Sequence, residues 1–296
     1  MKTFSDFVKN KPKESWLNYN GDFASIRKKA KESILSWPSS HGEIRRGIKR
    51  SKKPIKESIV PPSTDDVLKH THQNVTKDNI IFHDKVHDHP DIVPQKLTPE
   101  HLQSIKDYSE TESDDVDGDG SSKNINNYCR NRLSDDPNPP HKVMHQHPED
   151  VEFRTKQLMS AFTPENTNRK HVLTFSGIPP SIGHKFLKSP TGTKHTIAAP
   201  TSTSTHFRTA EDFGITHAIN EKADYTKPHV MVCHVEPGAG LSIAKHSKFS
   251  ENEVLLHPGA HVTYRGSEIN DEGIHLHHVT VHNTHKDLDD YPAYKR

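Results

Sequence analysis

The stretch "KFSENEVLLHPG", residues 248–259, places two carboxylates beside the start of an apolar strand. Glu251 and Glu253 are two residues apart, and the apolar run 254–256 follows directly, before a Pro-Gly turn. Side chains at i and i+2 of an extended segment point to the same side. A lone Glu-x-Glu is usually a pair of solvated charges on an edge strand, so its meaning depends on the rest of the chain.

The composition limits the class of protein. The chain has 296 residues, of which 30% are hydrophobic and 27% charged, so we expect part of it to lack a packed core. The net charge of +1 gives no indication of nucleic acid for the chain as a whole. Two cysteines, Cys129 and Cys233, fit a reducing compartment. No apolar run reaches the length of a membrane helix, and the N-terminus lacks the apolar core of a secretory signal.

The pattern changes from helical to extended along the chain. Thr98 as N-cap and Pro99 at N1 predict a helix over 97–110. Two more helices are predicted over 122–133 and 148–162. Short segments, mostly rich in β-branched residues, then predict strands, at 171–176, 194–203, 229–237, 252–258, 260–267 and 273–283, with a helix-like segment at 210–222. Helices followed by strands predict an α+β fold.

Two stretches upstream of the glutamates complete a set of motifs. "PTSTSTHFRTAEDF" (200–213) holds the hydroxyl-rich run 202–204, and "LTFSGIPPS" (173–181) is a strand that enters a Gly-Pro loop. With the Glu-x-Glu, this order resembles the Arg-Ser-Glu class of ADP-ribosyltransferases. The resemblance covers residues 97 to about 283, including the opening helices. It implies an ADP-ribosyltransferase-like fold, with N-terminal helices and two packed, mainly antiparallel sheets around an NAD cleft.

The resemblance also implies site residues, with NAD as substrate and no metal. Breaking the nicotinamide–ribose bond builds positive charge on the ribose, which a carboxylate stabilises. The family gives this role to the second glutamate, here Glu253, while the first, Glu251, acts on an acceptor such as an arginine. The other implied positions are Ser202, beside Glu253 and the nicotinamide riboside, Ser204, which ties the strand together, Ser176 and Gly177 of the first motif, and Ser247 and Phe249, which recognise the target.

One position departs from the family pattern. The first motif of the family is an aromatic residue, Arg and Gly, whereas this chain reads Phe175-Ser176-Gly177. The arginine that would bind the NAD phosphates is therefore absent from that position. A charge-assisted contact of this kind contributes about 1.5–3 kcal/mol. Three alternatives follow: another group compensates, NAD binds weakly, or catalysis has been lost.

Other candidate sites are weaker. The histidines of 83–91 and 275–285, in particular the pairs His87/His89 and His275/His277, are spaced to converge on a metal, but no Cys or carboxylate completes a set in 275–285. The acidic loop 113–122 resembles half a calcium loop and ends without its glutamate. The basic block 45–56 is either a DNA contact or a solvated arm.

The N-terminal residues "MKTFSDFVKN" resemble the capsid-targeting peptides of internal head proteins of T-even-type phages. The prohead protease of these phages cuts after an aliphatic-x-Glu sequence, which residues 55–57 match. Phages of this type package ADP-ribosyltransferases and inject them with their DNA. The resemblance therefore implies a protein of the phage head that later acts in the host cytoplasm.

We therefore predict four segments. These are a possible capsid-targeting segment at 1–19, a basic, His/Pro-rich arm or linker at 20–96, an ADP-ribosyltransferase-like domain at 97–285 and a tail at 286–296. The leading hypothesis is a phage-encoded mono-ADP-ribosyltransferase that modifies a host protein, on arginine. Its expected partners are that host protein, other virion proteins and DNA, which the basic block 45–56 would contact. No membrane partner is expected. The alternatives are a non-catalytic virion protein that keeps the fold as a structural or binding module, and a His-rich metal-binding protein.

Overall fold

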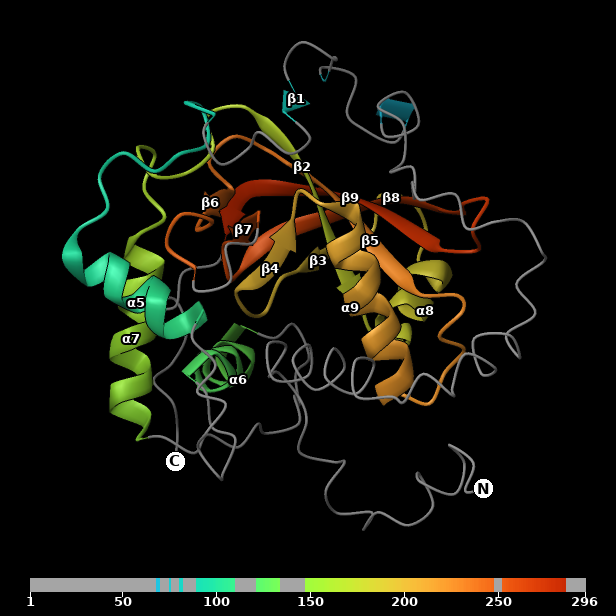
Figure 1. The fold of residues 1–296 in the computed structure, drawn as a ribbon, viewed down its shortest axis with the longest axis horizontal. Helices are drawn as coiled ribbons and strands as arrows, with labels where there is room; N and C mark the ends of the chain where they lie inside the picture. Colours follow the sequence, from blue (N-terminus) through green and yellow to red (C-terminus); the bar gives the residue numbers. More distant parts are fainter. Residues whose placement is uncertain are drawn as a thin grey trace, which may run out of the picture.

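The computed structural model of this chain describes residues 68–69, 75, 80–81, 89–109, 121–133, 147–247 and 252–285 (Figure 1). Three helices come first, α5 (Pro99–Ser109), α6 (Ser121–Leu133) and α7 (Pro148–Ser160). They confirm the three helices predicted from apolar spacing. The predicted segments 1–19 and 286–296, the basic block 45–56 and most of the acidic loop lie outside the described residues.

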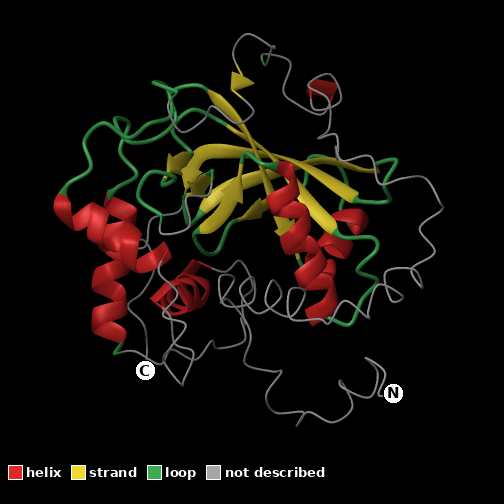
Figure 2. Ribbon diagram, in the orientation of Figure 1, coloured by secondary structure: helices red, strands yellow, loops and turns green. Residues whose placement is uncertain are grey.

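The second half of the chain forms a mixed, mostly antiparallel sheet with two helices. The strands are β1 (Ile80–Ile81), β2 (His171–Ile178), β3 (Lys194–Thr196), β4 (Thr201–Ser204), β5 (His229–Val235), β6 (Gly240–Ser242), β7 (Glu253–Leu256), β8 (Ala260–Ile269) and β9 (His275–His285). The helices are α8 (Pro180–Lys188) and α9 (Phe207–Asn220). In the view of Figure 1 and Figure 2, α5, α6 and α7 lie to the left and α8 and α9 to the right. The α+β class is thus confirmed.

The strands follow one hydrogen-bonded path rather than two separate sheets. Its order is β3-β8-β9-β5-β2-β4-β7-β6, with β1 attached to β2. The two parts of the path meet at a single pair, Phe175 with Ser204, whereas on its other side β2 is paired with β5 over residues 172–178. One buried cluster nevertheless joins Val254 and Leu256 of β7 to Tyr264 of β8. The expected two sheets are therefore two parts of one path, whose side chains share a core.

Two glycines bring α9 directly onto the sheet. A Cβ atom on Gly177 would lie 2.2 Å from the carbonyl oxygen of Ala210 and 2.3 Å from the backbone nitrogen of Gly214. On Gly214, a Cβ atom would lie 2.8 Å from the carbonyl oxygen of His229. A side chain at Gly177 would push α9 away from β2, and one at Gly214 would push it away from His229 of β5, which explains glycine at both positions.

Two elements differ from the sequence prediction. The region after Ile178 was expected to be a Gly-Pro loop, but Pro180 begins α8, since proline at the first helical position removes only a donor that has no partner there. The predicted strand 194–203 is two strands, β3 and β4, which pair with different neighbours, β8 and β7. No helix in the described part of the chain is long and apolar enough to cross a membrane.

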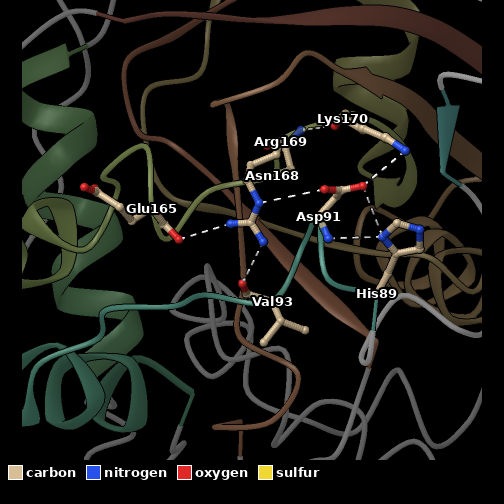
Figure 3. A network of polar contacts seen from close by, with 7 residues as sticks. All are labelled: His89, Asp91, Val93, Glu165, Asn168, Arg169 and Lys170. Atoms are coloured by element: carbon tan, nitrogen blue, oxygen red, sulfur yellow. Dashed lines mark hydrogen bonds and ion pairs between the residues drawn. The ribbon is translucent and has the colours of Figure 1, made fainter.

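The packed part of the chain begins before the predicted boundary at residue 97. Ile92 is fully buried in the cluster that also holds Val172 and Val254. Asp91 lies 3.2 Å from the Lys170 ammonium and 3.9 Å from the Arg169 guanidinium, and its carbonyl accepts the Arg169 backbone N–H at 2.7 Å (Figure 3). The described residues of the predicted arm that lie closest to the domain are therefore part of it, because they fill its core and pair with its charges.

Candidate functional site

Adjacent strands bring three of the predicted site residues to one face of the sheet. In the antiparallel pair of β4 and β7, Ser204 lies opposite Glu253 and Ser202 lies opposite Leu255. Directly opposed side chains on neighbouring strands point to the same face. Glu253 is 9% exposed, whereas Ser202 is open to solvent. Thr203, on the opposite face, donates from its hydroxyl to the Val254 carbonyl at 2.6 Å and so fixes the register of the two strands.

Tyr108 of α5 connects this face to the helices. Its hydroxyl donates to the Pro200 carbonyl at 3.2 Å. Burial raises the pKa of Tyr108 well above its usual value, the side chain of Ser202 lowers it in part, the charge of Glu253 raises it further, and Asn126 acts in the same direction as Ser202. The phenol therefore stays protonated and acts as a neutral partner between α5, α6 and β4.

Arg130 of α6 lies in the same group of side chains. It follows Asn126 by four residues, so both side chains are on one face of the helix. Burial lowers the pKa of Arg130, and interaction with Tyr108 and Cys129 opposes this shift. No carboxylate of the described residues forms an ion pair with it. A partly desolvated cation without a counter-charge is costly, and an anionic ligand would remove that cost.

Ser176 and Gly177 lie at the edge of this group, at the end of β2. The Ser176 hydroxyl donates to the Ser202 carbonyl at 3.1 Å, so it ties β2 to β4 where the family motif has an arginine. Gly177 provides the close contact with α9 described above. The structure thus places both residues next to Ser202, and their predicted contact with NAD stays a prediction.

The remaining predicted residues divide between described and undescribed positions. Ser204 accepts a hydrogen bond from the backbone N–H of His206 at 3.1 Å, which fixes the turn into α9. Ser247 is buried in the turn after β6, where its backbone N–H donates to the Ile243 carbonyl at 2.8 Å. Glu251 and Phe249 lie outside the described residues.

The histidine groups weighed as weaker metal candidates find no support in the described residues. Within them, no group of three or more His, Cys, Asp or Glu side chains is arranged to hold a metal ion. His275 and His277 lie on β9 and contact other histidines through their rings. His87 lies outside the described part of the chain.

Sequence reasoning did not identify Asn126 and Arg130 as site residues. The sequence feature that could have indicated them is their i, i+4 spacing on one helix. The same helix also carries the buried residues Ile125 and Tyr128. Polar residues at that spacing are typical of a solvated helix face. The packing of α5, which carries Tyr108, brings this face of α6 into the candidate site.

Neither a protein-family profile nor a curated protein sequence matches the chain. Several solved structures resemble it. Several of them are ADP-ribosyltransferases. The Vis toxin of Vibrio splendidus is 19% identical, over 62% of this chain and 74% of the toxin, with a TM-score of 0.45. The C3 exoenzyme of Clostridium limosum is 15% identical, over 63% of this chain and 87% of the exoenzyme, with a TM-score of 0.46. HopU1 of Pseudomonas syringae is 18% identical, over 62% of this chain and 77% of HopU1, with a TM-score of 0.43.

Proposed function

We propose that this chain is an NAD-dependent mono-ADP-ribosyltransferase. The observation that carries the proposal is the joint position of Glu253, Ser202 and Arg130 around Tyr108. NAD combines an anionic diphosphate with a ribose that becomes cationic during cleavage. A site with one carboxylate and one guanidinium without a counter-charge in the described residues complements both features.

Glu253 would stabilise the ribosyl cation. The bond between the ribose and the nicotinamide nitrogen breaks, and its electron pair leaves with the nicotinamide, which becomes neutral. Positive charge then remains on the ribose, as in glycoside hydrolysis. Because Glu253 is buried to more than nine-tenths, solvent screens its charge less than it would at the surface.

Arg130 would bind the diphosphate in place of the arginine missing at Ser176. A hydrogen bond between a guanidinium and a phosphate oxygen contributes about 1.5–3 kcal/mol. The Ser176 hydroxyl already donates to the Ser202 carbonyl and carries no charge, so it cannot replace that contact. The alternative of weak NAD binding then depends on how much of the lost energy Arg130 restores.

Glu251, Ser247 and Phe249 would act on the acceptor. For an arginine acceptor, a guanidinium nitrogen attacks the ribose carbon and loses a proton, which Glu251 accepts directly or through water. Ser247 and Phe249 would contact the protein that carries this arginine. The i, i+2 spacing of the two glutamates would present both carboxylates to the same substrates.

The N-terminal motif supports a biological setting. We propose that the protein is carried in a phage head and then modifies a host protein in the host cytoplasm. Other virion proteins, and DNA through the basic block 45–56, would be its partners in the head. The second candidate, a non-catalytic protein with the same fold, is favoured by Ser176, because its hydroxyl serves the backbone of β4 rather than a ligand.

A comparison of two glutamine variants tests the proposal. Glu253→Gln removes the charge where positive charge develops, and it should lower the rate of nicotinamide release from NAD by about 10²–10³. Glu272→Gln changes an exposed carboxylate in the turn before β9 and should leave the rate unchanged. Equal rates for wild type and Glu253→Gln would reject the catalytic role. Labelled NAD with host lysate then shows whether ADP-ribose reaches a protein.

A further inference from the structure

A chain of hydrogen-bonded side chains lies at the opposite end of the sheet from Glu253. Nδ1 of His229 is 2.9 Å from Nε2 of His277, and Nδ1 of His277 is 2.6 Å from the Ser267 hydroxyl. The Ser267 hydroxyl is 2.7 Å from that of Tyr264. His277 is 0% exposed and His229 is 3% exposed. The chain joins β5, β8 and β9 through polar groups inside the protein.

Two further imidazoles contact this chain. The ring of His229 stacks on that of His275, with centroids 4.6 Å apart, and on that of His277 at 5.1 Å. His184 of α8 approaches His229 edge-on at 5.2 Å. These four residues, His184, His229, His275 and His277, form what we call the histidine cluster. It brings one helix and two strands together.

The cluster is built for neutral rings. In the bond between His229 and His277, one nitrogen must carry a hydrogen and the other must accept it. If both rings were protonated, both nitrogens would carry hydrogens and the bond would be lost. Other titratable groups of the described residues that lie on or near the cluster are His195 of β3, Glu221 after α9, Lys227 before β5, Tyr264 and Glu268 of β8, and His278 of β9.

The surroundings oppose protonation. Burial, followed by the charges of His275 and His184, lowers the pKa of His229 to about 4, while Glu221 acts in the opposite direction. Burial and His229 lower the pKa of His277 to about 3. A serine, a histidine and an orienting second histidine are also the parts of a hydrolytic site. At neutral pH, however, a fully buried histidine with so low a pKa is a poor base for Ser267.

Helix α8 lies directly on this cluster. A Cβ atom on Gly183 would be 2.1 Å from Nδ1 of His229, so only glycine allows the helix to approach so closely. The start of α8 is held by Glu221, which accepts hydrogen bonds from the backbone N–H and hydroxyl of Ser181 at 2.9 and 2.6 Å. In the strand that leads into α8, Ile178 is the pairing partner of His229.

We propose that the histidine cluster is a pH-sensitive latch that holds α8 on the sheet when its rings are neutral and releases it in acid. Release exposes the rings of His229 and His277 to water, where they take up protons that the closed state excludes. The mutual repulsion of the cationic rings then keeps α8 away from β5. Because α8 follows β2 directly, its release also loosens the end of β2 that carries Ser176 and Gly177.

Hydrogen exchange of the α8 amides tests the latch. The opening constant of 180–188, corrected for intrinsic exchange, should rise between pH 7 and pH 5 by about tenfold per pH unit for each proton taken up on opening. Helix α6 serves as the internal reference and should change less. Equal protection of α8 at pH 7 and pH 5 would overturn the proposal.

Variants identify the groups responsible. His277→Gln cannot be protonated and should flatten the pH dependence of α8 exchange, while His217→Gln, at a half-buried histidine of α9, should keep it. His184 is exposed, so His184→Gln leaves the core intact and should move the opening curve to lower pH. Gly183→Ala should open α8 already at pH 7. An unchanged curve in both His184→Gln and His277→Gln would show that other groups cause the opening.

Discussion

The two ends of the sheet bury polar side chains in opposite ways. Near Glu253, the guanidinium of Arg130 is partly desolvated and has no ion-pair partner among the described residues. At the histidine end, neutral rings donate to and accept from one another, so His229 and His277 are satisfied without charge. A permanent charge left without a partner favours a ligand, whereas neutral titratable groups favour a response to pH. The difference separates a candidate binding site from a structural element that depends on protonation.

The largest expected effect is the loss of stability in acid. Burial lowers the pKa of His217 to about 4 and that of His234 to about 3. The unfolded chain therefore binds more protons than the folded one below the ordinary histidine pKa of about 6.5. The stability is fully present above that pKa and falls as the pH drops toward 4, by roughly 3 kcal/mol for His217 alone. Urea unfolding at several pH values measures this, and a flat profile from pH 7 to pH 4 would contradict it.

The next effect concerns the charge of Arg130, which has no ion-pair partner among the described residues. Arg130→Met keeps much of the side-chain volume but removes the charge, so NAD should bind about 10- to 150-fold more weakly, equivalent to about 1.5–3 kcal/mol. The free energy of unfolding should stay the same or rise, since a partly desolvated charge has been removed. Lys106→Met, at an exposed position of α5, is the control. Unchanged NAD affinity, measured by calorimetric titration, would separate Arg130 from the ligand.

A smaller effect is expected where the two ends meet, at the contact of β2 with α9. Gly177→Ala places a methyl group against the Ala210 carbonyl and should lower the free energy of unfolding by about 1–3 kcal/mol. Gly214→Ala should lower the free energy of unfolding by less, because its Cβ atom would be 2.8 Å from the nearest backbone atom. Thermal unfolding of both variants gives the comparison. The reverse order would mean that α9 does not pack as closely on β2 as described.

The smallest effect is the restoration of the motif arginine. Ser176→Arg adds a second cation beside Ser202 but removes the hydrogen bond to its carbonyl, which contributes about 0.5–1.5 kcal/mol. We expect NAD to bind up to about tenfold more tightly, a gain of about 1.4 kcal/mol. The same titration as for Arg130→Met measures it. Weaker binding would show that the pocket has been rebuilt around serine.

Much of the fold could be predicted from local pattern. Thr98 and Pro99 marked the start of α5, and runs of β-branched residues marked most of the longer strands. The helix α8 was missed because two consecutive prolines suggested a loop, although Pro180 suits the first position of a helix. The single residue pair that connects β2 to β4, Phe175 with Ser204, could not be predicted. It depends on pairing between strands that are far apart in sequence, about which local patterns carry no information.

The site could be predicted only where motifs carried it. Ser202 and Glu253 were predicted from their order in the chain, and they lie on paired strands. Arg130 was not predicted, because its interaction with Tyr108 depends on how α5 packs against α6. The histidines of 275–285 were considered as metal ligands from their spacing. Their stacking on His229 depends on the parallel pairing of β5 with β9.

The steady-state kinetics of NAD hydrolysis test the central claim most directly. If Glu253 stabilises the cation and Arg130 binds the diphosphate, Glu253→Gln should lower kcat by about 10²–10³ with little change in KM. Arg130→Met should instead mainly raise KM. Nicotinamide release by the wild-type protein at the rate of buffer alone, or equal kcat values for wild type and Glu253→Gln, would contradict the assignment.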